Sequence, residues 1–331
     1  MQIPEHWAEA RTEGKVKGKR RVVRRFGWSD TSAAEAEEMA ERRAAAALSE
    51  LQQGRIVNAR EPKIAYGGDG LPIREQVLAR DGDLVITRNS YGAHCLNEPD
   101  VMFVDVDVEA VLAPWLERAL SNTASVGAIF CVLLAIWLFS HQGPVGCVLL
   151  LAAVLLPLLV VSIRQKLRDR PGVFAANKQQ ARERIDEVAS TTQNGRFAVY
   201  ETPRGWRVLA LHRTFDPRSR EARDLMTAFG TDPTYAQMCE VQACFRARTS
   251  GKPWRMGIAT NMRPRPGLWP IRPERMPVRE AWVTDYEARA AGFAACRFVA
   301  ELGTGRCDPR CQRVQRVHDE LAKARSQLPL A

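Results

Sequence analysis

The sequence predicts a mixed α+β fold that two membrane-spanning helices interrupt. Stretches with the alternating pattern of strands and stretches with the pattern of helices occur on both sides of the middle of the chain. Between them, residues 119–163 contain no Asp, Glu, Lys or Arg, although 26% of the 331 residues are charged. These observations predict a cytosolic mixed sheet with flanking helices, interrupted by a transmembrane helical hairpin.

The charge-free stretch consists of two apolar runs, Ser125–Ser140 and Val145–Ile163, joined by His141–Pro144. A helix needs about 20 apolar residues to span a bilayer, and both runs approach that length when the uncharged residues before the first run are included. A core helix normally keeps a polar stripe, whereas these runs are apolar on every face. We therefore expect a transmembrane hairpin over 119–163, with a buried helical hairpin in a soluble core as the alternative.

Basic residues follow the second run, whereas the turn between the runs has no Lys or Arg. They are Arg164, Lys166, Arg168 and Arg170. Lys and Arg stay on the cytoplasmic side of a membrane. Residues 1–118 and 164–331 are therefore expected in the cytosol, as the two halves of one split α+β domain. The expected location is the cell inner membrane, with the lipid bilayer as a partner and both termini cytoplasmic.

The N-terminal half begins with a basic arm over 11–25, and no signal peptide precedes it. An Ala-rich helix follows, which a capping box at Ser32–Glu35 opens and which runs to about Leu51. The net charge of +10 and the pI near 9.5 suit contact with anionic lipid, or with a nucleic acid or nucleotide. The arm is expected to be solvated or to face lipid, with a specific nucleic-acid contact as the alternative.

The most informative polar stretch is an acidic strand over 101–108. Strand residues alternate between faces, so Asp105 and Asp107 share one face. Neighbouring carboxylates repel each other, and Mg²⁺ binds one or two carboxylates together with substrate phosphates. A divalent-metal site at Asp105 and Asp107 is therefore one interpretation. An edge strand whose acids point into water is the other.

A β-hairpin follows the apolar stretch, with strands over 197–202 and 206–212. Because the membrane excursion begins and ends on the same side, this hairpin is free to join the acidic strand in one sheet. The basic, Pro-rich segment 262–279 is expected to lack regular structure. Further helices are expected over 220–229, 232–239, 281–302 and 312–327.

Cations and aromatic residues are interspersed between the predicted helix over 232–239 and the Pro-rich segment. Arg246, Arg248 and Lys252 lie near Phe245 and Trp254 in the sequence. This mixture suits phosphate and base contacts, which makes the three cations candidate phosphate ligands. Cation–π packing within the fold, or an interfacial belt near lipid headgroups, explains the same pattern.

Two cysteine pairs have spacings near those of structural zinc sites: Cys239 with Cys244, and Cys307 with Cys311. Structural zinc takes four such ligands, so the four thiols are a candidate zinc site. Buried cysteine more often behaves as a small hydrophobic residue. Disulfides are not expected in a cytosolic protein.

Four strings of the sequence resemble an uncharacterised family of bacterial membrane-associated proteins, for which no activity is implied. They are RRFGWSD at 24–30, REPKIAYGGDGLPIRE at 60–75, TRNSYGAHCLN at 87–97 and CFRARTSGKPWR at 244–255. The resemblance runs over most of the chain.

A second resemblance joins the acidic strand to the hairpin. A strand of the form hhhDhD over 101–107, a helical connection and a T-x-x-G-x-H-like turn over 202–207 are similar to the core of archaeo-eukaryotic primase-like nucleotidyltransferases. The resemblance implies Mg²⁺ or Mn²⁺ at Asp105 and Asp107, and a phosphate contact at Arg207. The chain departs from that pattern, because Arg207 replaces a His and cannot carry a proton, and the third acidic motif has no counterpart that we can place.

Two functions follow from these observations. The first is an interaction or scaffold protein without catalysis, anchored at the inner membrane. The second is a metal-dependent primase-like nucleotidyltransferase or nucleotide-binding enzyme that uses Asp105 and Asp107. The positions of Asp105, Asp107, Arg207 and His212 relative to one another distinguish the two.

Overall fold

The computed structural model describes residues 3–61, 71–112, 115–122, 129, 132, 136, 143–168 and 170–331. The described chain is a mixture of strands and helices, as the sequence predicts for its α+β part. Its contacts divide it into two units. The first joins Met1–Val106 to Ile185–Ala331, and the second comprises Asp107–Arg184.

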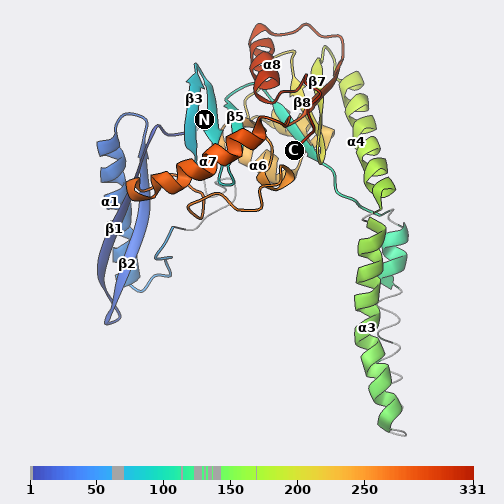
Figure 1. The fold of residues 1–331 in the computed structure, drawn as a ribbon, viewed down its shortest axis with the longest axis horizontal. Helices are drawn as coiled ribbons and strands as arrows, with labels where there is room; N and C mark the ends of the chain where they lie inside the picture. The colour runs from blue at the N-terminus through green and yellow to red at the C-terminus, as the bar shows by residue number, and fades with distance from the viewer. Residues whose placement is uncertain are drawn as a thin grey trace. The chain divides into compact units, whose positions relative to one another are not determined.

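The N-terminal layer is a two-stranded antiparallel ribbon with one helix against it (Figure 1). The strands are β1 (His6–Val16) and β2 (Lys19–Ser29), and the helix is α1 (Ala33–Gln52). Ser32 caps α1 by accepting a hydrogen bond from the backbone N–H of Glu35, as the capping box predicts. The buried face of α1 consists of alanines, namely Ala36, Ala40, Ala44 and Ala47.

Close packing between α1 and β2 depends on Gly27. A Cβ atom at Gly27 would lie 2.1 Å from the carbonyl oxygen of Ala36 and 2.4 Å from the backbone nitrogen of Ala40. Both atoms belong to the helix backbone, which cannot move aside as a side chain can. The alanine face and this glycine therefore bring helix and ribbon together at backbone distance.

A four-stranded antiparallel sheet has the order β3-β4-β5-β9. Its strands are β3 (Gln76–Asp81), β4 (Leu84–Arg88), β5 (His94–Glu98) and β9 (Phe245–Arg248). The last strand is far from the others in sequence, and its register pairs Leu96 with Ala247. The cation-rich segment identified in the sequence thus begins as a partly buried strand.

The other four-stranded sheet has the order β10-β7-β8-β6. Its strands are β6 (Phe103–Asp107), β7 (Phe197–Thr202), β8 (Gly205–Ala210) and β10 (Arg297–Leu302). The acidic strand β6 is hydrogen-bonded to β8 of the hairpin. The expectation that these strands join one sheet is therefore confirmed.

Helices account for most of the remaining described chain. They are α3 (Gly143–Arg168), α4 (Pro171–Thr191), α5 (Arg220–Phe229), α6 (Pro233–Gln242), α7 (Met276–Ala290) and α8 (Pro309–Leu321), with short 3-10 turns at η2 (Pro253–Arg255) and η3 (Pro273–Arg275). The helix predicted over 281–302 is wrong beyond residue 290. The second half of that range forms β10, because Phe298 and its neighbours pair with β7 across the sheet.

The prediction of a transmembrane hairpin over 119–163 is wrong for the described chain. Within the residues that the structure describes, no helix has both the length and the apolar character that crossing a bilayer requires. The predicted inner-membrane location and two-helix topology are overturned with it. Part of the first run lies outside the described residues.

A charge-free stretch is a property of composition, and it does not fix where a helix begins and ends. The helix α3 continues past the apolar run into Arg164, Lys166 and Arg168. Arg164 and Arg168 form ion pairs with Glu117 at 3.0 and 2.5 Å. Three of the four basic residues that were used to predict an orientation in the membrane are thus part of α3, and two of these three pair with Glu117.

We expect Gly27→Ala to lower the free energy of unfolding by about 2 kcal/mol, because α1 would have to separate from β2 to admit the methyl group. Gly172→Ala in α4 is the matched control, since a Cβ atom there meets no heavy atom within 4 Å. That change should be neutral, or stabilising by less than about 1 kcal/mol. Urea unfolding followed by circular dichroism measures both. Equal midpoints for the two variants would contradict the close-packing argument.

Candidate functional site

The acidic strand and the hairpin place Asp105 beside Arg207. The Asp105 Oδ1 atom lies 3.8 Å from Arg207 Nη2, and the side chains are 35% and 4% exposed. Asp107, at the end of β6, is exposed. Asp105 therefore already faces a cation of the protein, at the outer limit of ion-pair distance.

Arg207 is held on several sides by polar groups of the core. Its Nη1 donates hydrogen bonds to the carbonyl oxygen of Arg248 at 2.8 Å and to His318 Nε2 at 3.2 Å. A guanidinium only donates, so His318 Nε2 accepts and its Nδ1–H donates to Asp319 Oδ1 at 3.1 Å. We interpret Arg207 as a structural cation, because its N–H groups point into the core and not toward a phosphate site.

The metal sites predicted from the sequence gain no support from this geometry. In the described part of the chain, no group of three or more His, Cys, Asp or Glu side chains is arranged to hold a metal ion. The pair Cys239 and Cys244 is buried at the end of α6. Cys311 Sγ donates to the carbonyl oxygen of Arg213 at 3.3 Å, and burial raises its pKa to about 12. Cys311 is thus a buried, hydrogen-bonded thiol of the core.

The other predicted phosphate ligands have partners inside the fold. Arg246 forms a buried ion pair with Glu75, with Nη2 at 2.5 Å from Oε2. Arg248 Nη1 donates to the carbonyl oxygens of Ser250 and Ala331. Lys252 Nζ lies 5.7 Å from the centroid of the Trp254 ring. The cation–π alternative is thus confirmed for Lys252, and all three residues take part in packing.

A cysteine, a histidine and an aspartate occur together beneath Arg207. Cys296 Sγ lies 3.8 Å from His318 Nε2, and Asp319 contacts the opposite nitrogen. The order of groups matches that of a thiol nucleophile with its base and orienting acid. Burial raises the pKa of Cys296 to about 11 and lowers that of His318 to about 4. Because Arg207 also donates to the same Nε2 and both side chains are fully buried, the arrangement lacks an activated thiolate and access for a substrate.

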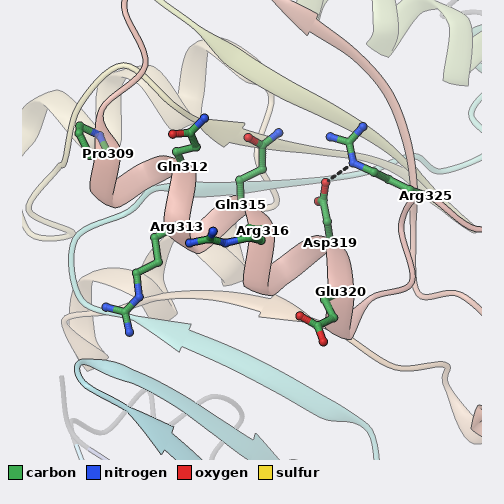
Figure 2. Close-up of a pocket in the computed structure, with 8 residues that line it drawn as sticks. All are labelled: Pro309, Gln312, Arg313, Gln315, Arg316, Asp319, Glu320 and Arg325. Carbon is green, nitrogen blue, oxygen red and sulfur yellow. Dashed lines mark hydrogen bonds and ion pairs between the residues drawn. The ribbon is translucent and has the colours of Figure 1, made fainter.

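One cavity along α8 shares Asp319 with this cluster (Figure 2). It measures about 570 Å³ and is lined by Pro309, Gln312, Arg313, Gln315, Arg316, Asp319, Glu320 and Arg325. Figure 2 shows Arg325 reaching to Asp319, where Nε and Oδ2 are 2.9 Å apart, while Arg313 points away from them. Arg313 is held by Asp81 at 2.6 Å. Two of the three arginines that line this cavity are thus paired with carboxylates of the protein.

A larger cavity of about 1250 Å³, which we call the arginine pocket, is formed by loops that sequence reasoning did not bring together. It is lined by Thr192, Gln193, Asn194, His212, Arg213, Arg220, Glu221, Asp224, Leu225, Ala228, Thr304, Gly305 and Arg306. These residues come from the turn after α4, the segment after β8, the start of α5 and the loop after β10. A signal was present, since Arg213 and Arg306 each follow a strand, but β10 was predicted as helix and the two loops were not recognised as neighbours.

Two glycines allow one wall of the arginine pocket to form. A Cβ atom at Gly305 would lie 1.9 Å from the carbonyl oxygen of Asn194, and Gly303 has φ +83° beside Gly195. The backbone N–H of Gly305 donates to the Gly195 carbonyl at 3.0 Å. The loop that carries Arg306 is thus fixed to the turn after α4 by backbone contacts.

The arginines of the pocket differ in how far they are neutralised. Arg213 Nη1 donates to Glu221 Oε2 at 3.0 Å, and Arg220 Nε lies 3.4 Å from Asp224. Arg306 is exposed and forms no ion pair with any residue that the structure describes. The carboxylates orient two guanidinium groups at the rim, and the third is available to an anion.

His212 adds a neutral group to the same pocket. Its Nδ1–H donates to the carbonyl oxygen of Arg196 at 3.2 Å, and its ring lies edge-on to Phe197 at 5.0 Å. Burial lowers the pKa of His212 below its usual value, so the ring is neutral at pH 7 and keeps Nε2 as an acceptor. His212 thus belongs to the arginine pocket, whereas Asp105 and Arg207 belong to the cluster around His318.

A buried carboxylate near the end of β5 should make stability depend on pH. Burial and the neighbouring Asp100 raise the pKa of Glu98 to about 7, against the opposing attraction of Arg310. Glu98 Oε1 accepts from Arg310 at 2.8 Å, and the side chain is 1% exposed. Its folded-state pKa lies above the unfolded value, so its favourable contribution is present below about pH 4.5 and is lost as the pH rises through 7.

We therefore expect Glu98→Gln to reduce the loss of stability between pH 4.5 and pH 8.5. The shift of pKa corresponds to about 3 kcal/mol between the two proteins across that range. Urea unfolding at intervals of half a pH unit measures the difference, in which groups common to both proteins cancel. Parallel curves for the wild type and the variant would show that Glu98 ionises normally in the folded chain.

Arg207→Met should lower the free energy of unfolding by about 3 kcal/mol, because the Arg248 carbonyl and His318 Nε2 lose a buried donor. Asp105→Asn is the control. Its side chain is partly exposed and its contact with Arg207 is long, so the expected loss is below about 1 kcal/mol. Thermal and urea unfolding measure both effects. Wild-type stability of Arg207→Met would exclude the structural role.

Comparison with known proteins finds no matching family model, and no curated protein or solved structure with significant similarity to the chain. The two resemblances seen in the sequence therefore stay expectations. The candidate site rests on geometry, and of the two cavities described above the arginine pocket has the charges that are better arranged for a ligand.

Proposed function

We propose that the chain is a binding protein for a small phosphate-bearing ligand, which it holds in the arginine pocket. The observation that carries this proposal is the exposed Arg306, which shares one cavity with Arg213 and Arg220. Guanidinium groups match the geometry of phosphate oxygens and stay charged at every physiological pH. An anion that bridges these loops would gain several charge-assisted hydrogen bonds.

The ion pairs already present in the pocket do not prevent this binding. Arg213 and Glu221 are 46% and 60% exposed, and Arg220 and Asp224 are 90% and 65% exposed. Exposed pairs of this kind contribute at most about 1 kcal/mol each, so a phosphate can displace or share their guanidinium groups at low cost. The start of α5, at Arg220, also directs the positive end of its helix dipole to this side of the cavity.

The cavity suits a ligand larger than inorganic phosphate. Its volume of about 1250 Å³ exceeds that of many small-molecule pockets. Leu225 and Ala228 form an apolar part of the lining, and Asn194 and Thr304 provide polar groups. A phosphorylated molecule with a ring or other apolar portion, of nucleotide size, would use both parts.

Binding without metal-dependent turnover fits the positions of the other candidate residues. Asp105 and Asp107 are not among the residues that line the arginine pocket, and Arg207 is engaged in the core. The nucleotidyltransferase interpretation therefore lacks a described site in which metal ligands and phosphate ligands meet. A binding role agrees with the interaction function expected from the sequence, without the membrane anchor.

Titration calorimetry with ATP, adenosine and inorganic phosphate tests the proposal, each in the presence of EDTA. We expect ATP to bind and adenosine not to bind. Arg306→Gln should weaken ATP binding about tenfold or more, as the loss of one charge-assisted contact predicts. Arg223→Gln is the matched control, because Arg223 lies on α5 outside the lining and pairs with Glu240.

Two outcomes would contradict the proposal. One is the absence of ATP and phosphate binding up to millimolar concentration, and the other is an equal effect of Arg306→Gln and Arg223→Gln. ATP binding that requires Mg²⁺ and is lost in an Asp105→Ala, Asp107→Ala double variant would instead support the metal-dependent enzyme.

A further inference from the structure

The far end of the β1–β2 ribbon carries a concentration of positive charge. The strands are joined at Lys17 and Gly18, both with positive φ (48° and 75°), and Val16 pairs with Lys19. Two residues in this conformation form the tight turn typical of twisted hairpins. We define the basic tip as Lys15, Lys17, Lys19, Arg20 and Arg21, all of which are exposed.

The basic tip extends past the helix that supports the ribbon. Gln52, the last residue of α1, donates through Nε2 to the carbonyl oxygen of Lys15 at 3.4 Å. Leu48, one turn earlier, packs against Gly14. The support therefore ends where the basic tip begins, so the tip projects on a ribbon whose base is held against α1.

Positive charge is neutralised along the base of the ribbon but not at its tip. At the base, Glu9 forms ion pairs with Arg11, Arg24 and Arg272. At the tip, only Arg20 has an acidic partner, Glu13 at 2.5 Å. The other four cations of the basic tip form no ion pair with the residues that the structure describes. Four uncompensated, exposed charges within seven residues form a patch of positive potential that attracts a polyanion.

We propose that the basic tip binds double-stranded DNA, as a ribbon that enters the major groove and contacts the phosphates on either side. The major groove of B-form DNA is about 12 Å wide and admits a two-stranded β-ribbon, whose strands are about 4.8 Å apart. Lys and Arg side chains on both strands then reach the two phosphate backbones.

The chemistry of the basic tip favours duplex DNA over other nucleic acids. Binding of single strands relies on aromatic side chains that stack on bases, and the segment from Lys15 to Arg21 contains none. The major groove of duplex RNA is too deep and narrow for side chains to enter. The segment also lacks Asn and Gln, which read adenine. The contact that we propose is the one that its Lys and Arg side chains make to the phosphate backbone, which is independent of base sequence.

Fluorescence anisotropy of the full chain with a labelled 20-base-pair DNA duplex, between 50 and 200 mM salt, tests this inference. Four or five phosphate contacts predict that log K falls with log salt at a slope of about −4. The test variant combines Lys15→Gln, Lys17→Asn, Lys19→Gln and Arg21→Gln. Asn is used at position 17 because it tolerates positive φ.

A control variant with the same loss of charge separates the basic tip from the general basicity of the chain. It combines Arg42→Gln, Arg204→Gln, Arg223→Gln and Arg289→Gln, four exposed positions away from the tip. We expect the tip variant to lose affinity at least about tenfold at 100 mM salt and most of the salt slope, and the control to retain both. Circular dichroism of both variants verifies that they fold.

The proposal is overturned if the wild type does not bind the duplex at 50 mM salt, or if the tip and control variants bind alike. Binding of an RNA duplex of the same sequence with equal affinity would exclude the groove contact. The arginine pocket is unaltered in the tip variant, so ATP binding measured in parallel distinguishes failure of this inference from failure of the proposed function.

Discussion

Burial of the Arg207 guanidinium is the constraint on which the core of this protein depends. Arg207 lies on β8, its Nη1 donates to the backbone of Arg248 on β9, and the same nitrogen reaches His318 on α8. These three elements belong to two different sheets and a helix. A buried cation must have its donors satisfied, so the sheets and α8 can only pack in the arrangement that brings these acceptors together.

Buried charges elsewhere in the described core follow the same rule. Arg246 of β9 forms an ion pair with Glu75, and Arg310 of α8 forms one with the buried Glu98. Such pairs are weak evidence for stability, because desolvation offsets much of the attraction. The Arg246–Glu75 pair makes the packing specific, since both side chains are buried and removing either partner leaves a charge in the interior.

Cations near the surface are arranged differently, and the difference bears on function. The arginine pocket and the basic tip each contain positive charge that the described protein does not compensate, at Arg306 and along the end of the ribbon. The two surfaces favour anions of different shape. The pocket is a cavity between loops, which suits a small phosphorylated molecule, whereas the tip is a projecting ribbon that suits a groove.

Local features of this protein followed from the order of its residues. The capped helix α1, the acidic strand β6 and the hairpin of β7 and β8 were predicted correctly, because capping, alternation and turn residues act between near neighbours. Long-range packing decided the rest. Pairing with β7 made residues 297–302 a strand, and the core surrounded Arg207 instead of leaving it for a phosphate. The tertiary fold also assembled the arginine pocket from loops distant in sequence. Composition and spacing carry no information on which distant groups share a cavity, since that depends on the free energy of the whole packed core.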